Sequence, residues 1–231
     1  ANLEDAATGI VRSAFGLQGQ KCSANSRIFV ENAVKDKLLA KLLDKTRALT
    51  IGDPTVRANW LGPVVNAAQY RDFGDYCEEL SQAGTILHGG HKLSGVKDGL
   101  DFGKGYYCEP TLVDNVPASH RLWKQEMFLP IAMVEGFEDL TYAMTRANDV
   151  AYGLTAGFYG SKKEAAWFFD KIEAGVTYAN RPQGATTGAW PGFQPFGGWK
   201  GSGSSGKNGG GLYYVPLYLH EQIRTHIERL K

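Results

Sequence analysis

The residue best suited to covalent chemistry is Cys22, which lies in the polar, glycine-containing segment Gln18-Gly-Gln-Lys-Cys-Ser-Ala-Asn25. Thiolates are strong nucleophiles, and a cysteine is ionised to a small extent even near neutral pH, so modest activation is enough. The adjacent Lys21 and the open backbone amides of a connection would favour the thiolate. We therefore predict that Cys22 is a nucleophile, whereas for Cys77 and Cys108 the pattern favours small buried hydrophobic residues.

The number and spacing of the cysteines argue against other roles. The three residues are odd in number and widely separated, and none belongs to a C-x-x-C pair. Neither a disulfide framework nor a zinc site is expected, and no metal site is predicted. Unpaired thiols fit a reducing compartment, so we expect a cytoplasmic protein.

The composition is that of one globular domain with a single large core. Of 231 residues, 43% are hydrophobic and 21% are charged, and the net charge is +1 with scattered basic residues. This distribution provides no electrostatic surface for nucleic acid or anionic lipid. No apolar run approaches the roughly 20 residues that cross a bilayer, and no secretory signal pattern is present. We expect a small-molecule partner, with no nucleic acid and no membrane.

The elements around Cys22 follow from periodicity and breakers. Residues 2–16 carry apolar side chains at helical spacing, with Asn2 placed as a cap, and predict a helix. Glycines end it, and residues 27–31 predict a short buried strand. Cys22 is thus expected in a helix-to-strand connection. Further along, we expect helices at 33–48 and 66–82 and an exposed connection at 89–105.

The second half of the chain alternates between strand and helix patterns. Such alternation indicates the α/β class, with a mostly parallel or mixed sheet covered by helices. After residue 180, glycine, serine, proline and aromatic residues predominate, and the interleaved aromatic residues favour an ordered functional loop. The alternating elements are predicted at 131–134 (strand), 140–148 (helix), 155–159 (strand), 162–174 (helix) and 175–179 (strand).

Two phosphate-binding patterns overlap at the glycine-rich stretch 201–207. Gly201, Gly203 and Gly206 satisfy G-x-G-x-x-G, and the stretch also satisfies G-x-x-x-x-G-K. A dinucleotide loop needs a hydrophobic strand before it and a helix after it, and the sequence predicts neither. The P-loop form lacks its magnesium-binding hydroxyl, because Asn208 stands there. We expect a close-packed turn, and a nucleotide site here would require affinity that depends on Lys207.

Five blocks of the sequence together resemble the catalytic domain of the aldehyde dehydrogenase superfamily. The first resembles its active-site cysteine signature, the others follow in family order, and the likeness extends over nearly the whole chain. The blocks are Gly19-Gln-Lys-Cys22-Ser-Ala-Asn-Ser-Arg27-Ile-Phe-Val30, Gly105-Tyr-Tyr-Cys-Glu-Pro-Thr-Leu-Val113, Gln125-Glu-Met-Phe-Leu-Pro130, Ala147-Asn-Asp-Val-Ala-Tyr-Gly-Leu154 and Pro195-Phe-Gly-Gly198.

The resemblance implies a covalent mechanism with a nicotinamide cofactor. Cys22 would add to the aldehyde, hydride would pass to NAD or NADP, and water would release the acid from a thioester. The backbone N–H of Cys22 would be one oxyanion donor, an interaction worth about 3–4 kcal/mol of barrier. Glu126 resembles the carboxylate that holds the nicotinamide ribose, and Phe128 resembles the aromatic residue beside that ring. A solvated surface acid is the alternative for Glu126. Leu129 departs from the family's usual glycine, and its branched side chain is expected to restrict the turn.

Within the superfamily, the closest resemblance is to the branch of 1-pyrroline-5-carboxylate dehydrogenases, which oxidise glutamate γ-semialdehyde to glutamate in proline catabolism. It rests on Ser23, on 180–189 and on 210–219. By this resemblance Ser23, Gly188 and Ala189 hold the amino-acid head group and Phe196 packs on the aliphatic stem. The alternatives are a plain tight turn at Gly188 and Ala189, a core aromatic at Phe196, and a broader-specificity aldehyde dehydrogenase.

The resemblance also bounds what this chain contains. Residues 1–231 are expected to form a single catalytic domain that lacks the family's upstream nucleotide-binding domain, its second oxyanion donor and its general base. The start at Ala1, directly on a helical pattern, favours a part of a longer protein, inactive alone. The alternative is an isolated domain with a binding or structural role. A full-length homo-oligomer is expected, with 221–228 as an arm that pairs with a neighbour.

Overall fold

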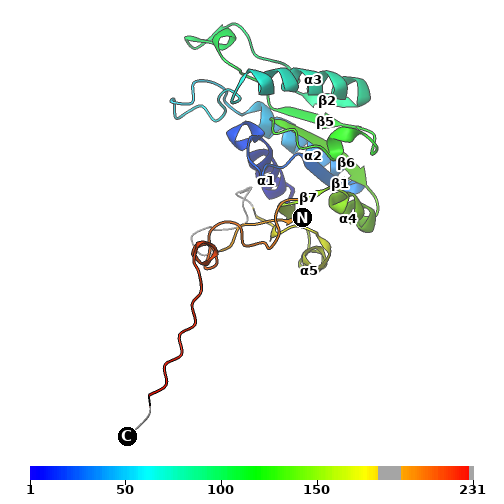
Figure 1. Cartoon of the computed structure of the whole chain (residues 1–231). Helices are drawn as coiled ribbons and strands as arrows, with labels where there is room; N and C mark the ends of the chain where they lie inside the picture. The colour runs from blue at the N-terminus through cyan, green and yellow to red at the C-terminus, as the bar shows by residue number, and fades with distance from the viewer. Residues whose placement is uncertain (182–193, 229–231) are drawn as a thin grey trace.

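A four-stranded mixed sheet organises the computed structural model, which describes residues 1–181 and 194–228 (Figure 1). The strand order is β1 (Arg27–Glu31), β6 (Ile131–Phe137), β5 (Thr111–Asp114) and β2 (Thr85–His88). The first three strands are mutually parallel, and β2 is antiparallel to β5. The predicted α/β class with a mostly parallel sheet is confirmed.

Alternate side chains of these strands enter two separate cores, as a pleated strand requires. Ile28 and Val30 face the core formed with α1 and α2, while Phe29 between them packs against the core formed with α3. Neighbouring strands repeat the alternation, because Leu112 belongs to the first core and Val113 to the second. The sheet is therefore covered on both faces.

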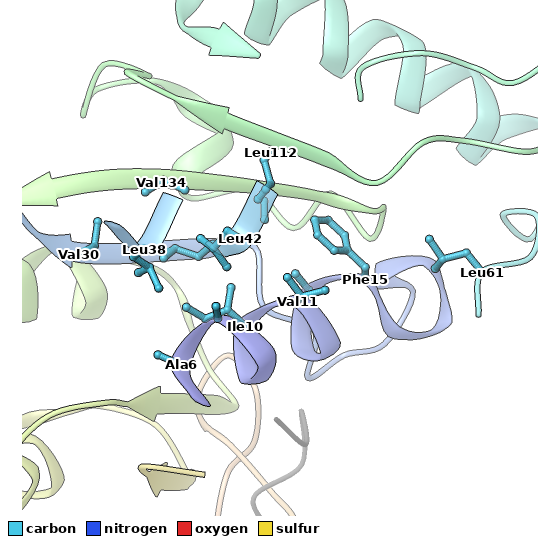
Figure 2. Packing of buried hydrophobic residues seen from close by; sticks show 14 residues of the cluster. Ala6, Ile10, Val11, Phe15, Val30, Leu38, Leu42, Leu61, Leu112 and Val134 are labelled. Atoms are coloured by element: carbon cyan, nitrogen blue, oxygen red, sulfur yellow. The ribbon is translucent and has the colours of Figure 1, made fainter. Parts of the chain in front are cut away.

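Helices α1 (Leu3–Phe15) and α2 (Asn32–Arg47) cover one face (Figure 2). As predicted, Asn2 caps α1: its Oδ1 accepts hydrogen bonds from the amides of Glu4 and Asp5 at 3.0 and 3.3 Å. Phe15 and Leu42 are completely buried where the two helices meet the sheet. The predicted first helix and strand thus lie where the sequence placed them, on either side of Cys22.

Helix α3 (Ala67–Ala83) covers the opposite face. Phe73, Cys77 and Leu80 form its buried side. They pack against the short 3₁₀ helix η3 (Arg121–Trp123), whose Trp123 ring stacks on Phe29 with centroids 5.8 Å apart.

A smaller group of elements follows β6. Helix α4 (Leu140–Asn148) has the predicted bounds, but α5 (Lys162–Lys171) ends three residues earlier than expected. The backbone becomes extended at Ile172 (φ −75°, ψ 131°), but Ile172 and Ala174 are still buried. The apolar periodicity of the sequence therefore continues past the end of the helix, which is why the predicted helix was too long. The strands are β7 (Tyr152–Gly153), which pairs antiparallel with β10 (Trp199–Lys200), and β8 (Thr155–Phe158), which pairs parallel with β9 (Val176–Ala179).

The remaining segments lie on the outside. The expected exposed connection at 89–105 contains a small hairpin, β3 (Val96–Lys97) with β4 (Leu100–Asp101), and the 3₁₀ turn η2 (Phe102–Lys104). After η4 (Val215–Tyr218) the described chain extends away from the body (Figure 1). Among the described residues, no helix is both long and apolar enough to cross a membrane.

Candidate functional site: the Cys22 connection and its cleft

A run of left-handed backbone leads from α1 to Cys22. The 3₁₀ turn η1 (Gly16–Gly19) contains Leu17, Gln18 and Gly19 at φ of 53°, 59° and 68°. Such values are costly for non-glycine residues, and consecutive ones occur where surrounding structure imposes them. Cys22 follows this run and is exposed, on a turn that the Ala24 amide closes by donating a hydrogen bond to the Lys21 carbonyl oxygen at 2.9 Å.

Two contacts fix this connection to other parts of the chain. A Cβ atom on Gly19 would lie 2.3 Å from the carbonyl oxygen of Leu129, so the two backbones are in direct contact. The side-chain oxygen of Gln20 accepts a hydrogen bond from the amide of Val65 at 3.0 Å. The first contact holds the cysteine loop, residues 16–26 between α1 and β1, against the segment that contains Glu126 and Phe128.

The departure at Leu129 does not disturb this segment in the expected way. The Leu129 side chain is 3% exposed and belongs to the α3 core. The left-handed residue of the turn is the preceding Phe128, at φ 57°. The leucine therefore fills the core, and the tight backbone geometry falls on its neighbour.

A cleft of about 720 Å³ brings together three of the predicted site residues, Cys22, Ser23 and Glu126. Cys22 and Glu126 are exposed, while Ser23 is buried and its carbonyl accepts a hydrogen bond from Thr155 Oγ1 at 3.4 Å.

Phe128 (37% exposed) and Phe196 do not line this cleft. Phe196 pairs its backbone with Gly209, at 2.7 and 2.8 Å. Gly188 and Ala189 lie outside the described residues.

Burial separates the three thiols. Burial raises the pKa of Cys77 and of Cys108 to about 12, so both stay protonated at neutral pH. Cys22 is the exposed one. Burial also lowers the pKa of the adjacent Lys21, and the negative charge of a Cys22 thiolate opposes that shift. The two groups therefore interact electrostatically.

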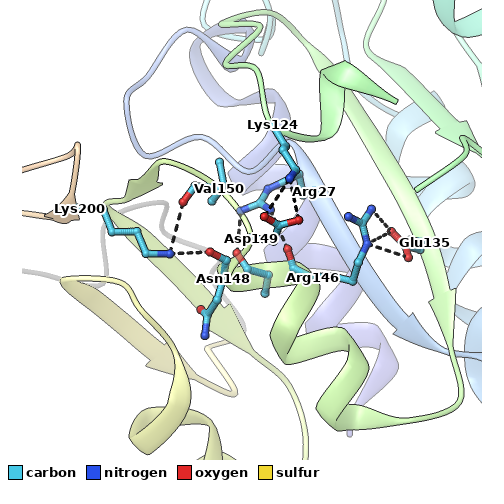
Figure 3. A network of polar contacts seen from close by, with 9 residues as sticks. Arg27, Lys124, Glu135, Arg146, Asn148, Asp149, Val150 and Lys200 are labelled. Carbon is cyan, nitrogen blue, oxygen red and sulfur yellow. Dashed lines mark hydrogen bonds and ion pairs between the residues drawn. The ribbon is translucent and has the colours of Figure 1, made fainter. Parts of the chain in front are cut away.

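A network of polar contacts supports the cleft and was not predicted from the sequence (Figure 3). Arg27 donates to the carbonyl oxygens of Arg146 and Ala147 at 3.3 and 3.1 Å, where the dipole of α4 favours a cation. Arg146 in turn pairs with Glu135 at 2.8 Å, and Lys124 pairs with Asp149 at 2.7 Å. The one feature of the sequence that could have indicated this network is the Ala147–Leu154 block, which supplies carbonyl and carboxylate partners to it.

The same block anchors the glycine-rich stretch. Lys200 Nζ donates to the carbonyl oxygen of Val150 at 3.3 Å, and the Gly201 amide bonds to Ala151 at 2.8 Å. A Cβ on Gly203 would lie 2.8 Å from the Gly198 carbonyl oxygen. No α-helix follows this stretch within the described residues up to 228. These contacts support the close-packed turn over either phosphate-binding loop.

The described residues were also searched for side chains that could bind a metal ion. Across residues 1–181 and 194–228, no group of three or more His, Cys, Asp or Glu side chains is arranged to hold an ion.

Comparison with known proteins defines the family. The model of the aldehyde dehydrogenase family matches residues 1–222, so this chain belongs to that family. It is 35% identical over 226 residues to the 1-pyrroline-5-carboxylate dehydrogenase of Geobacillus kaustophilus, covering 97% of this chain and 41% of that protein. The enzyme of the same name from Bacillus subtilis is 36% identical over 231 residues, covering 99% of this chain and 42% of that protein.

Solved structures agree with the sequence comparison. The 1-pyrroline-5-carboxylate dehydrogenase from Thermus with bound NAD superposes with a TM-score of 0.85 at 37% identity, covering 95% of this chain and 40% of that one. Betaine aldehyde dehydrogenase from Staphylococcus aureus gives 0.78 at 29% identity, covering 87% and 38%. The chain thus spans about two fifths of the length of these relatives.

Proposed function

We propose that this chain is the thiol-bearing catalytic part of an NAD(P)-dependent aldehyde dehydrogenase that oxidises glutamate γ-semialdehyde to glutamate. The observation that carries the proposal is the exposed Cys22 in a cleft that it shares with Ser23 and Glu126. The two relatives described above, at 35% and 36% identity, are both 1-pyrroline-5-carboxylate dehydrogenases, and they support the choice of substrate.

In this proposal the sulfur of Cys22 attacks the aldehyde carbon and forms a thiohemiacetal. Within the described residues the backbone N–H of Cys22 donates no hydrogen bond, so it can serve the developing oxyanion, an interaction worth about 3–4 kcal/mol. A nicotinamide cofactor, when bound, accepts the hydride. The resulting thioester on Cys22 is then hydrolysed to release the carboxylic acid.

The residues of the Gln125–Pro130 segment fit a nicotinamide nucleotide. Glu126 presents an exposed carboxylate at the wall of the cleft, and carboxylates accept hydrogen bonds from ribose hydroxyls. Phe128 is 37% exposed on the same segment, leaving part of its ring open for contact with a flat partner. Glu126 would hold the ribose and Phe128 would lie beside the nicotinamide.

Ser23, Gly188 and Ala189 would hold the amino-acid head group, and Phe196 would pack on the aliphatic stem of the substrate. Ser23 lines the cleft directly after the nucleophile, and a hydroxyl with exposed backbone amides can bind a carboxylate without a buried cation. A site that hydrogen-bonds a polar head group discriminates strongly against aldehydes that lack it.

The complete enzyme would be a longer protein and a homo-oligomer. The relatives are more than twice as long as this chain, and a nucleotide-binding domain, general base and second oxyanion donor would come from outside residues 1–231. Ile223 and Ile227 are 95% and 82% exposed on the extended segment after η4. An extended chain with exposed apolar residues can add to the sheet of a neighbouring copy.

The first test maps the reactive thiol. The intact chain is treated briefly near neutral pH with limiting iodoacetamide, and mass spectrometry of peptides identifies the modified cysteine. Modification of Cys22 well ahead of Cys77 and Cys108 supports the proposal, and equal modification of all three contradicts it. In the longer protein, Cys22→Ser should abolish oxidation of glutamate γ-semialdehyde with NAD or NADP, and undiminished turnover would refute the assigned nucleophile.

A further inference from the structure

The position of the Glu126 carboxylate is set by its neighbours in the chain. The carboxylate is exposed at the wall of the cleft and makes no hydrogen bond or ion pair with any described residue. Residues 126–128 lie outside any helix or strand, and their amides donate no hydrogen bond to the described backbone. After Glu126 the chain is held by Met127 and Leu129, which are buried in the α3 core. Before Glu126 it is held at Gln125.

Both polar atoms of the Gln125 side chain are engaged. Its Nε2 donates a hydrogen bond to the hydroxyl of Tyr76, on α3, at 3.0 Å, and its Oε1 accepts one from Arg121 Nη1. The backbone amide of Gln125 also donates to the Arg121 carbonyl oxygen at 3.2 Å. Arg121 is therefore in contact with both the side chain and the backbone of the residue that precedes Glu126.

Glu79, on α3, holds Arg121 in turn. Its two carboxylate oxygens accept hydrogen bonds from Arg121, one from Nε at 2.8 Å and one from Nη2. The Nε2 atom of His120 lies 3.3 Å from the same carboxylate. Tyr76 is one helical turn before Glu79, and the Arg121 guanidinium lies over its ring, 5.6 Å from the centroid. Isolated surface ion pairs hold geometry weakly, but a bidentate arginine–carboxylate pair within a network fixes it.

We infer that Glu79 is a positioning residue for the nicotinamide cofactor: through Arg121 it fixes the chain that presents Glu126 to the cleft. The inference rests on the proposed function, in which Glu126 holds the ribose. Glu79 does not line the cleft, so it acts without touching the cofactor or the aldehyde. Because another side of α3 is buried in the core, the Glu79 carboxylate has a fixed base.

The first experiment measures hydrogen exchange in this chain. In Glu79→Ala the backbone amides of residues 121–126 should exchange about threefold to tenfold faster, the range for losing a partly exposed ion-pair network that limits local opening. Glu79→Gln keeps an acceptor for Arg121 without the charge and should fall between. Glu78→Ala is the matched control and should leave the exchange unchanged, because Glu78 is exposed on the same helix and its carboxylate has no partner among the described residues.

The second experiment measures the kinetics of the longer protein. Glu79→Ala should raise the KM for NAD or NADP by about threefold to tenfold, as expected for a displaced binding group, and leave the KM for glutamate γ-semialdehyde unchanged. Loss of folded protein alone would lower the maximal rate and change neither KM. In a Glu126→Gln background the same substitution should change the cofactor KM by less than about twofold, because residues that act through one another are not additive.

Unchanged exchange in residues 121–126, an unchanged cofactor KM, or additive effects of Glu79→Ala and Glu126→Gln would overturn the inference and leave the proposed function intact. Faster exchange with an unchanged cofactor KM belongs to the same outcome, because the ion pair would then stabilise only the surface. A longer protein that oxidises no aldehyde with NAD or NADP would overturn the proposed function, and the inference with it.

Discussion

Substitution of Gly19 by alanine isolates the contact that holds the cysteine loop against the Glu126 segment. Gly19 has φ 68°, and the new methyl group would lie 2.3 Å from the Leu129 carbonyl oxygen and 2.7 Å from its carbon. The left-handed conformation costs a non-glycine residue about 1–2 kcal/mol. Forcing an extra carbon into a packed site adds about 1–3 kcal/mol to this cost. The Leu129 carbonyl cannot easily move aside, because it is a backbone group whose oxygen accepts a hydrogen bond from the Ile131 amide at 2.8 Å. The total is a loss of about 2–5 kcal/mol.

Gly206→Ala provides the matched comparison. Gly206 has the same φ of 68°, but a Cβ there meets nothing within 4 Å. It should lose only the conformational part, about 1–2 kcal/mol. Urea unfolding of both variants gives the steric part as their difference, and iodoacetamide labelling reports whether Cys22 has moved. Equal losses for the two variants would refute the argument that the Leu129 backbone holds the loop in place.

Further outcomes follow from burial and charge. Phe15→Ala should cost about 3–5 kcal/mol in urea unfolding because Phe15 is completely buried, whereas Leu17→Gly, at an exposed left-handed position, should be neutral or stabilising by up to about 1 kcal/mol; a reversed order would contradict the placement of η1. Lys45 and Lys41 lower the pKa of Glu4 from 4.5 to about 2, so the stabilisation is present above pH 4.5 and is lost as the pH falls toward 2. The thermal midpoint of Glu4→Gln should therefore lie below wild type at pH 7 and converge with it near pH 2; a constant gap would exclude that ion pair as the cause. Cys77 and Cys108, with pKa values raised to about 12, should resist iodoacetamide at pH 9 until urea unfolds the chain, and prompt labelling in the folded state would show that they are accessible.

The elements with strong local signals were predictable from sequence. Asn2 caps α1 and Asp139 caps α4, and both helices formed within a residue or two of their expected bounds. Strands β2 and β5, of four residues each, were not assigned from the sequence. Their identity depends on pairing with each other and with β6, which is long-range information absent from a local pattern.

The candidate site shows the same division. An exposed Cys22 beside a polar turn could be anticipated from its neighbours in sequence, and the cleft brings Ser23 and Glu126 to it. The support could not be anticipated, because Arg27 reaches carbonyl oxygens about 120 residues away. Backbone carbonyls carry no side-chain signature, so such contacts leave no residue-type signal in the sequence.

The backbone contact between Gly19 and Leu129 also bears on how this site can vary among relatives. Position 129 touches the cysteine loop through its carbonyl oxygen, which every amino acid possesses, while its side chain belongs to the α3 core. Evolution can therefore exchange glycine for leucine at position 129 by adjusting core volume, without altering what the loop rests on. Position 19 has no such latitude, since any side chain there meets the carbonyl directly. The contact therefore permits different side chains at position 129 but requires glycine at position 19.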